Sequence, residues 1–92
     1  MAYTIKKLSA MPYAQAKVHI DEDGYIWLIS YRTVVAGITP DGWLNVNGLY
    51  SATTRRHIGA FVKEYANITY QIAKMLYTDA YLYNIHTGEI IG

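Results

Sequence analysis

The feature that most constrains the fold is the segment 50–65, which reads YSATTRRHIGAFVKEY. Three hydroxyl side chains near its start can accept hydrogen bonds from the free backbone N–H groups of a first helical turn: Ser51, Thr53 and Thr54. Four large side chains then recur at helical spacing: Ile58, Phe61, Val62 and Tyr65. The pattern predicts a helix that starts here and buries this stripe.

The basic residues of this segment take different places around the predicted helix. On a helical projection, Thr54 falls in the middle of the apolar stripe. Arg55 and His57 fall on its two edges, so we expect them to border the core. Arg56 and Lys63 lie on the far side and are expected to face water.

The charge of this helix start is unusual. A helix N-terminus carries roughly half a positive elementary charge and favours Asp or Glu in its first turn. This segment has two arginines and a histidine instead, and no Glu or Gln follows the threonines at capping-box spacing. One interpretation is an external anion, because N–H groups, hydroxyls and guanidinium groups together bind phosphate or carboxylate. The other is that a carboxylate from a distant loop, or water alone, satisfies the arginines.

The segment 17–29 predicts a β-hairpin. Residues 17–20 and 25–29 are rich in β-branched and aromatic side chains, and the turn sequence DEDG lies between them at 21–24. The β-prone character then continues without a turn residue to Ile38. We therefore predict one long, bent strand over residues 25–38.

A second hairpin is predicted where Asp41-Gly42 returns the chain into a strand at 43–46. A meander of at least three antiparallel strands results. Residues 1–15 are predicted to be an irregular arm, because Met11 precedes a proline and is biased away from helix.

The C-terminal third allows two interpretations. Thr69 can cap a second helix with a shared apolar face made of Ile68, Ile72, Ala73, Leu76 and Ala80. Alternation in the same segment is also compatible with a strand, but the helix formers at 71–76 favour the helix. Residues 81–91 predict two short strands around Thr87-Gly88, or an arm that docks on the sheet edge.

Composition excludes several classes of function. The absence of cysteine rules out disulfides, thiolate metal sites and thiol nucleophiles. A net charge of +1 gives no global basic field, so nucleic-acid binding would depend on a local patch. No apolar run approaches the ~18 residues of a membrane span, and the N-terminus lacks the order of a signal peptide. A cytoplasmic protein without membrane association is expected.

Ten tyrosines in 92 residues are the strongest compositional anomaly. Tyrosine suits binding surfaces because its rigid ring has little entropy to lose and its hydroxyl can face water. It also suits ordinary half-buried positions. On the first interpretation the chain self-associates, as a dimer.

Catalytic and metal sites find little support. The three histidines lie on different predicted elements without ligand spacing, which argues against a metal site. A Ser–His–Asp set could be drawn from Ser30 or Ser51 with His57 and Asp41, but no nucleophile motif accompanies it. We expect a non-enzymatic protein that needs no cofactor.

Three segments resemble a family of small, uncharacterised proteins of bacteriophages and mobile elements: 28–36, 50–58 and 84–91. The resemblance spans roughly residues 17–91 and combines a Ser-Tyr-x-Thr segment with a Tyr-Ser-x-Thr-Thr-x-x-His segment. It points to a shared polar set of Ser30, Tyr31, Thr33, Tyr50, Ser51, Thr54 and His57. It implies no enzyme activity. Small accessory phage proteins of this kind often neutralise a host defence component or a nucleotide signal that it makes.

These observations predict an α+β domain over residues 1–92, an antiparallel β-meander of three or more strands packed with one or two α-helices. Its expected role is an inhibitor of host defence that binds an anionic ligand or a host defence protein in the host cytoplasm. A nucleic-acid-binding accessory protein and a structural homo-oligomeric module are the alternatives. The predicted anion- or partner-binding residues are Tyr31, Arg32, Thr33, Tyr50, Ser51, Thr54, Arg55, Arg56 and His57.

Overall fold

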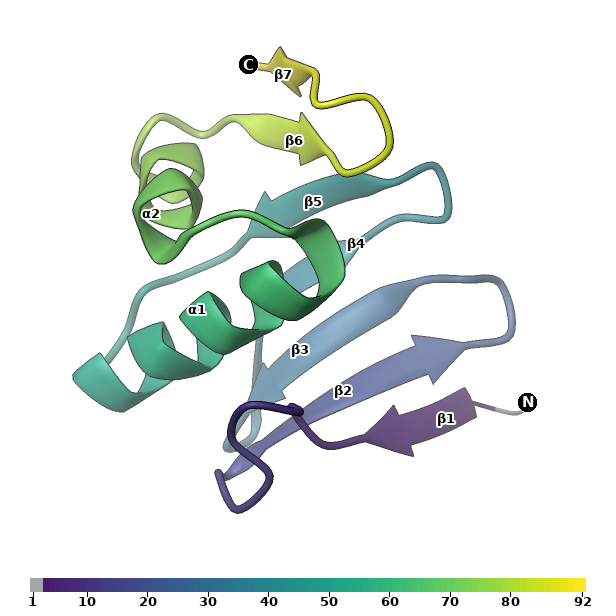
Figure 1. Ribbon diagram of the computed structural model, residues 1–92, viewed down its shortest axis with the longest axis vertical. Helices are drawn as coiled ribbons and strands as arrows, with labels where there is room; N and C mark the ends of the chain where they lie inside the picture. The colour runs from purple at the N-terminus through teal and green to yellow at the C-terminus, as the bar shows by residue number, and fades with distance from the viewer. Residues whose placement is uncertain (1–2) are drawn as a thin grey trace.

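The computed structural model describes residues 3–92 and has an α+β fold. Seven antiparallel strands form one sheet in the order of the sequence. Two helices, which follow β5 and precede β6 in the sequence, lie on one face of it (Figure 1). The strands are β1 (Tyr3–Lys6), β2 (Ala16–Asp21), β3 (Ile26–Ser30), β4 (Thr33–Ile38), β5 (Trp43–Val46), β6 (Leu82–Asn84) and β7 (Ile90–Ile91). The helices are α1 (Ala52–Ala66) and α2 (Tyr70–Thr78).

Both predicted hairpins are confirmed. In the first, β2 and β3 pair with Val18 opposite Leu28, and Asp21 closes the turn because its Oδ1 accepts from the N–H groups of Asp23 and Tyr25. In the second, β4 and β5 pair across the turn that contains Gly42, whose φ of 94° favours glycine.

The predicted long strand over 25–38 is wrong. The chain turns back at Tyr31 and Arg32, so that β3 and β4 pair with each other and Ser30 lies opposite Thr33. Tyr31 makes the turn possible by adopting a φ of 58°, in the left-handed region that tyrosine rarely enters. No Gly, Asn or Asp marks this position, so turn chemistry could not reveal it.

The predicted irregular arm is also partly wrong. Residues 3–6 form β1, which pairs with β2 so that Ile5 lies opposite His19. Two contacts hold the loop that follows β1. Leu8 is completely buried in the core, and Ser9 donates from its N–H and Oγ to the carboxylate of Glu64 on α1.

Both helices start at the predicted residues. The Ser51 hydroxyl caps α1, and the Thr69 hydroxyl caps α2, which confirms the helix and excludes the strand. Ala73 and Leu76 face the core as expected, whereas Ile72 and Ala80 are exposed. The C-terminal segment forms two short strands that extend the sheet beyond β5.

The core lies between the sheet and the helices. Helix α1 packs against β3 and β4, and α2 packs against β5. Phe61 is completely buried among aliphatic side chains such as Leu28, Leu44 and Leu76. The molecule is only 19 Å deep along its shortest axis, as expected for one sheet and a single layer of helices. No helix within residues 3–92 is long and apolar enough to span a membrane.

Candidate functional site

The start of α1 and the turn between β3 and β4 meet at one end of the sheet. The Ser51 hydroxyl accepts a hydrogen bond from the backbone N–H of Thr54 at 3.1 Å and thereby caps the helix. Ser30, the last residue of β3, faces the same helix because it lies two positions after the buried Leu28 and so shares its face of the sheet. Residues that lie 24 and 27 positions apart in the chain are therefore brought into contact.

Four polar side chains form a continuous hydrogen-bonded chain at this contact. Ser51 Oγ donates to Thr54 Oγ1 at 3.2 Å, and Thr54 Oγ1 lies 3.0 Å from Ser30 Oγ. Ser30 Oγ in turn lies 2.8 Å from His57 Nδ1. Because each hydroxyl has one proton, a chain of donation from Ser51 through Thr54 and Ser30 to Nδ1 would need the neutral imidazole tautomer that carries its proton on Nε2.

His57 is a neutral, buried part of this chain. Only 1% of its surface is exposed, and burial lowers the pKa of His57 below the ordinary value of 6.5. The ring of Tyr31 lies beside it, with centroids 5.9 Å apart and a tilt of 49°. Among residues 3–92, no buried side-chain nitrogen or oxygen lacks a hydrogen-bond partner. The turn after β3 is held onto α1 by the bonds of Ser30 to Thr54 and His57.

The remaining predicted site residues are exposed around this buried chain. Tyr31 and Tyr50 expose 58% and 65% of their surface. Arg32 and Thr33 lie in and just after the turn that Tyr31 begins. All four surround the end of the sheet where α1 starts.

Of the two arginines of α1, one does not lie where the sequence predicted. Arg55 was expected to border the core but is exposed, because its Nε turns back to donate to the backbone carbonyl of Leu49 at 3.0 Å. Arg56 is exposed as expected. The first turn of α1 contains no acidic residue. The structure thus gives Arg55 a carbonyl partner in place of a carboxylate.

The nine predicted residues therefore divide into two groups. Thr54 and His57 are buried and structural, and the other seven are exposed at the same end of the sheet. Ser30, which links the two buried members, was not among these nine residues, although the shared polar set of the resemblance includes it. Strand alternation, which places Ser30 on the same face as Leu28, is the local signal that it faces the helix.

The topology separates the charges of the chain between the two ends of the sheet. Strand ends alternate between these ends in an antiparallel meander. The end at the start of α1, here called the basic end, has Lys6, Lys7, Lys17, Arg32, Arg55 and Arg56. The opposite end, here called the acidic end, has Asp21, Glu22, Asp23, Asp41 and Glu89. Two further acidic residues lie toward the basic end, because Glu64 is bonded to Ser9 in the loop between β1 and β2, and Asp79 precedes the start of β6. The net charge of +1 therefore conceals a partial separation of charge.

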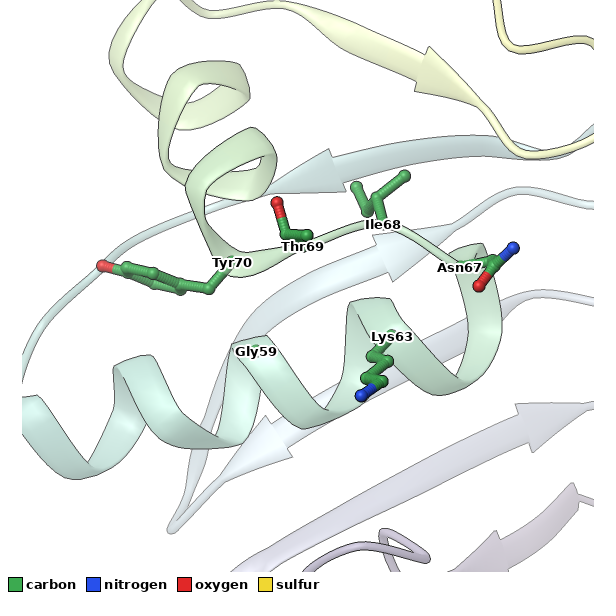
Figure 2. A pocket seen from close by; sticks show the side chains of 6 residues that line it. All are labelled: Gly59, Lys63, Asn67, Ile68, Thr69 and Tyr70. Atoms are coloured by element: carbon green, nitrogen blue, oxygen red, sulfur yellow. The ribbon is translucent and has the colours of Figure 1, made fainter.

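A surface pocket of about 350 Å³ lies between α1 and the start of α2, away from the predicted residues (Figure 2). It is lined by Gly59, Lys63, Asn67, Ile68, Thr69 and Tyr70. Asn67 ends α1 in a left-handed conformation with a φ of 56°, which turns the chain into the pocket wall. The sequence analysis did not predict this pocket.

The other sets of polar residues do not converge in the described part of the chain. Asp41 lies at the acidic end, where its backbone carbonyl accepts from Asn84 Nδ2, so it does not join Ser30 and His57. Within residues 3–92, no group of three or more His, Cys, Asp or Glu side chains is arranged to hold a metal ion.

The fold and this end of the sheet define a small α+β protein, in which an antiparallel meander supports a helix that starts with hydroxyls and arginines. The chain belongs to a family of unknown function, DUF8033, whose family model matches residues 4–79. The match starts at the second residue of β1, continues through α2 and ends before β6. No curated protein and no solved structure matches the chain significantly.

Proposed function

We propose that this protein is a non-enzymatic binding protein whose basic end engages an anionic partner. The observation that carries the proposal is the separation of charge: all three arginines of the chain lie at the end of the sheet where α1 starts. The positive end of the α1 dipole adds to their field, and no acidic residue in the first turn opposes it. Such a local field attracts anionic partners although the net charge is small.

A role in binding rather than in chemistry is supported by the burial of the best nucleophile. Ser30 is the hydroxyl beside His57, but only 2% of its surface is exposed. A substrate carbonyl would have to displace the turn at Tyr31 to reach Ser30 Oγ. The exposed side chains at this end are arginine and tyrosine, which are enriched in protein interfaces.

The resemblance to proteins of phages and mobile elements supplies the biological setting of the proposal. In that setting the protein inhibits a host defence in the host cytoplasm by binding a defence protein or a phosphorylated nucleotide signal. An extended acidic surface suits the site better than a small nucleotide, because the basic side chains extend from β1 to α1 and the pocket lies elsewhere. A nucleic-acid-binding accessory role is the second candidate, since the same cations would neutralise phosphates.

The test compares two double variants with the same change in charge. Arg55→Glu with Arg56→Glu reverses the basic end, and Lys63→Glu with Lys74→Glu makes the same change elsewhere on the helices. The arginine variant should keep its fold, because glutamate suits a helix N-terminus by ~0.3–1 kcal/mol, which offsets the lost bond from Arg55 to Leu49. Circular dichroism and thermal melting check this.

Binding is measured by native mass spectrometry of protein isolated from phage-infected cells and by titration with a fluorescent oligonucleotide at several salt concentrations. We expect the arginine variant to lose its anionic partner and the lysine variant to keep it. Retention of a small phosphorylated molecule would identify a nucleotide signal, and a steep salt dependence with the oligonucleotide would identify nucleic acid. Equal binding by the arginine variant and the wild type would overturn the proposal.

A further inference from the structure

The sheet face opposite the helices, here called the open face, has several large apolar side chains. Strand alternation places Lys17, His19 and Asp21 of β2 on it, because Val18 faces the core. The register then extends one row across five strands: Ile5, His19, Trp27, Gly37 and Asn45. The next row consists of Lys17, Ile29 and Val34.

Two aromatic rings pack against each other on part of this face. Tyr25 and Trp27 are stacked, with ring centroids 5.5 Å apart and an interplanar angle of 3°. Gly37 makes room for the indole, since a Cβ at that position would lie 2.9 Å from a ring carbon of Trp27. Ile5 and Val34 on the same face expose 53% and 40% of their surface. No helix within residues 3–92 covers this side (Figure 1).

We infer that the open face is the interface of a homodimer in which two sheets pack face to face with β2 of one copy antiparallel to β2 of the other. Two features support a second copy as the occupant. The first is size: the two longer dimensions of the molecule are 31 Å and 30 Å. A face of this extent can supply the ~800 Å² per partner that a standard stable interface buries.

The second feature is charge complementarity. Lys17 and Asp21 lie at opposite ends of β2 on the open face. A twofold axis that runs across the strands between the two sheets reverses each strand over its symmetry mate. Lys17 of one copy then lies over Asp21 of the other, and each basic end lies over an acidic end. Aligned sheet packing at about −30° retains this arrangement.

Nucleic acid fits the open face less well than a second copy does. A stacking platform for bases also needs a groove of cations that follows the phosphates. Within β2 to β5, strand alternation places one lysine and one aspartate on this face, Lys17 and Asp21. The three arginines belong to the turn after β3 and to α1, so the dimer leaves them free for another partner.

The test compares two variants, each of which introduces one carboxylate, on opposite sides of the sheet. Val34→Asp puts a carboxylate in the inferred interface, and Ile72→Asp puts one on α2 at a side chain of similar exposure, 36%. Aspartate also suits the first turn of α2, so the control should fold. Sedimentation equilibrium should show a dimer of the 10.4 kDa chain for the wild type and for Ile72→Asp. Val34→Asp should weaken the dimer by roughly tenfold or more, because the interface would bury an unpaired charge.

A second pair of variants tests the antiparallel arrangement. Lys17→Glu should weaken the dimer severalfold at low salt, since it places a glutamate over Asp21 of the other copy. Lys63→Glu makes the same charge change on α1 and should leave the dimer unchanged. A monomeric wild type at high micromolar concentration, or a Val34→Asp dimer as strong as the wild type, would overturn the inference. An unchanged Lys17→Glu dimer would overturn the antiparallel arrangement.

Discussion

Ser30 Oγ lies 2.8 Å from His57 Nδ1, which joins the end of β3 to the first half of α1 across 27 residues of sequence. The same oxygen lies 3.0 Å from Thr54 Oγ1, so one hydroxyl serves two buried partners of the helix. This contact holds the turn with Tyr31 and Arg32 beside the arginines of α1. The shape of the basic end therefore depends on a neutral hydrogen-bonded chain.

Ser30→Ala is expected to lower the free energy of unfolding by about 1–3 kcal/mol, because the Thr54 hydroxyl and His57 Nδ1 would lose their shared partner while buried. Urea denaturation measures the change. Ser9→Ala is the matched control, since the Ser9 hydroxyl bonds to Glu64 at an exposed site. An equally small effect of both substitutions would contradict a structural role for Ser30.

Stability should fall as pH falls below about 6.5. Burial lowers the pKa of His57 in the folded state, so the unfolded chain takes up a proton at a pH where the folded chain does not. The unfolded state is thus favoured from the ordinary pKa of 6.5 down to the lowered pKa of the folded protein. Urea midpoints between pH 7.5 and about 5.5 check this. His57→Gln should flatten the dependence, and an equal slope in that variant would assign it to other groups.

Phe61→Ala is expected to cost about 3–5 kcal/mol, because Phe61 is completely buried between α1 and the sheet. That loss is a large part of the ~5–15 kcal/mol that stabilises a typical domain. Thermal melting should show partial or complete unfolding. Tyr77→Ala removes an aromatic ring that is 42% exposed on α2 and should change stability by no more than about 0.5 kcal/mol.

Asn67 provides a test of backbone strain at the end of α1. Its φ of 56° lies in the left-handed region, where Asn and Gly are tolerated. Asn67→Ala should destabilise the protein by about 1 kcal/mol, whereas Asn67→Gly should be neutral or slightly stabilising. If both variants melt at the same temperature, below that of the wild type, the side chain of Asn67 matters at this position and its backbone conformation does not.

Much of the fold could be predicted because its signals are local. The start of α1 follows from Ser51 and the stripe that contains Phe61, and the start of α2 follows from Thr69. The turns at 21–24 and at Asp41-Gly42 are encoded by residues that favour turns. The turn at Tyr31 was missed because a tyrosine with positive φ is held there by tertiary contacts, among them the ring of His57.

The sequence by itself determined the elements and the unusual charge of the helix start, because capping, turns and amphipathic stripes act over a few residues. It also indicated most members of the candidate site. Only the tertiary structure decided that Ser30 meets His57, and that six of the eight Lys and Arg residues and five of the seven Asp and Glu residues lie at opposite ends of the sheet. The physical reason is the antiparallel meander, which places successive turns at alternate ends and so brings residues together that no local pattern relates.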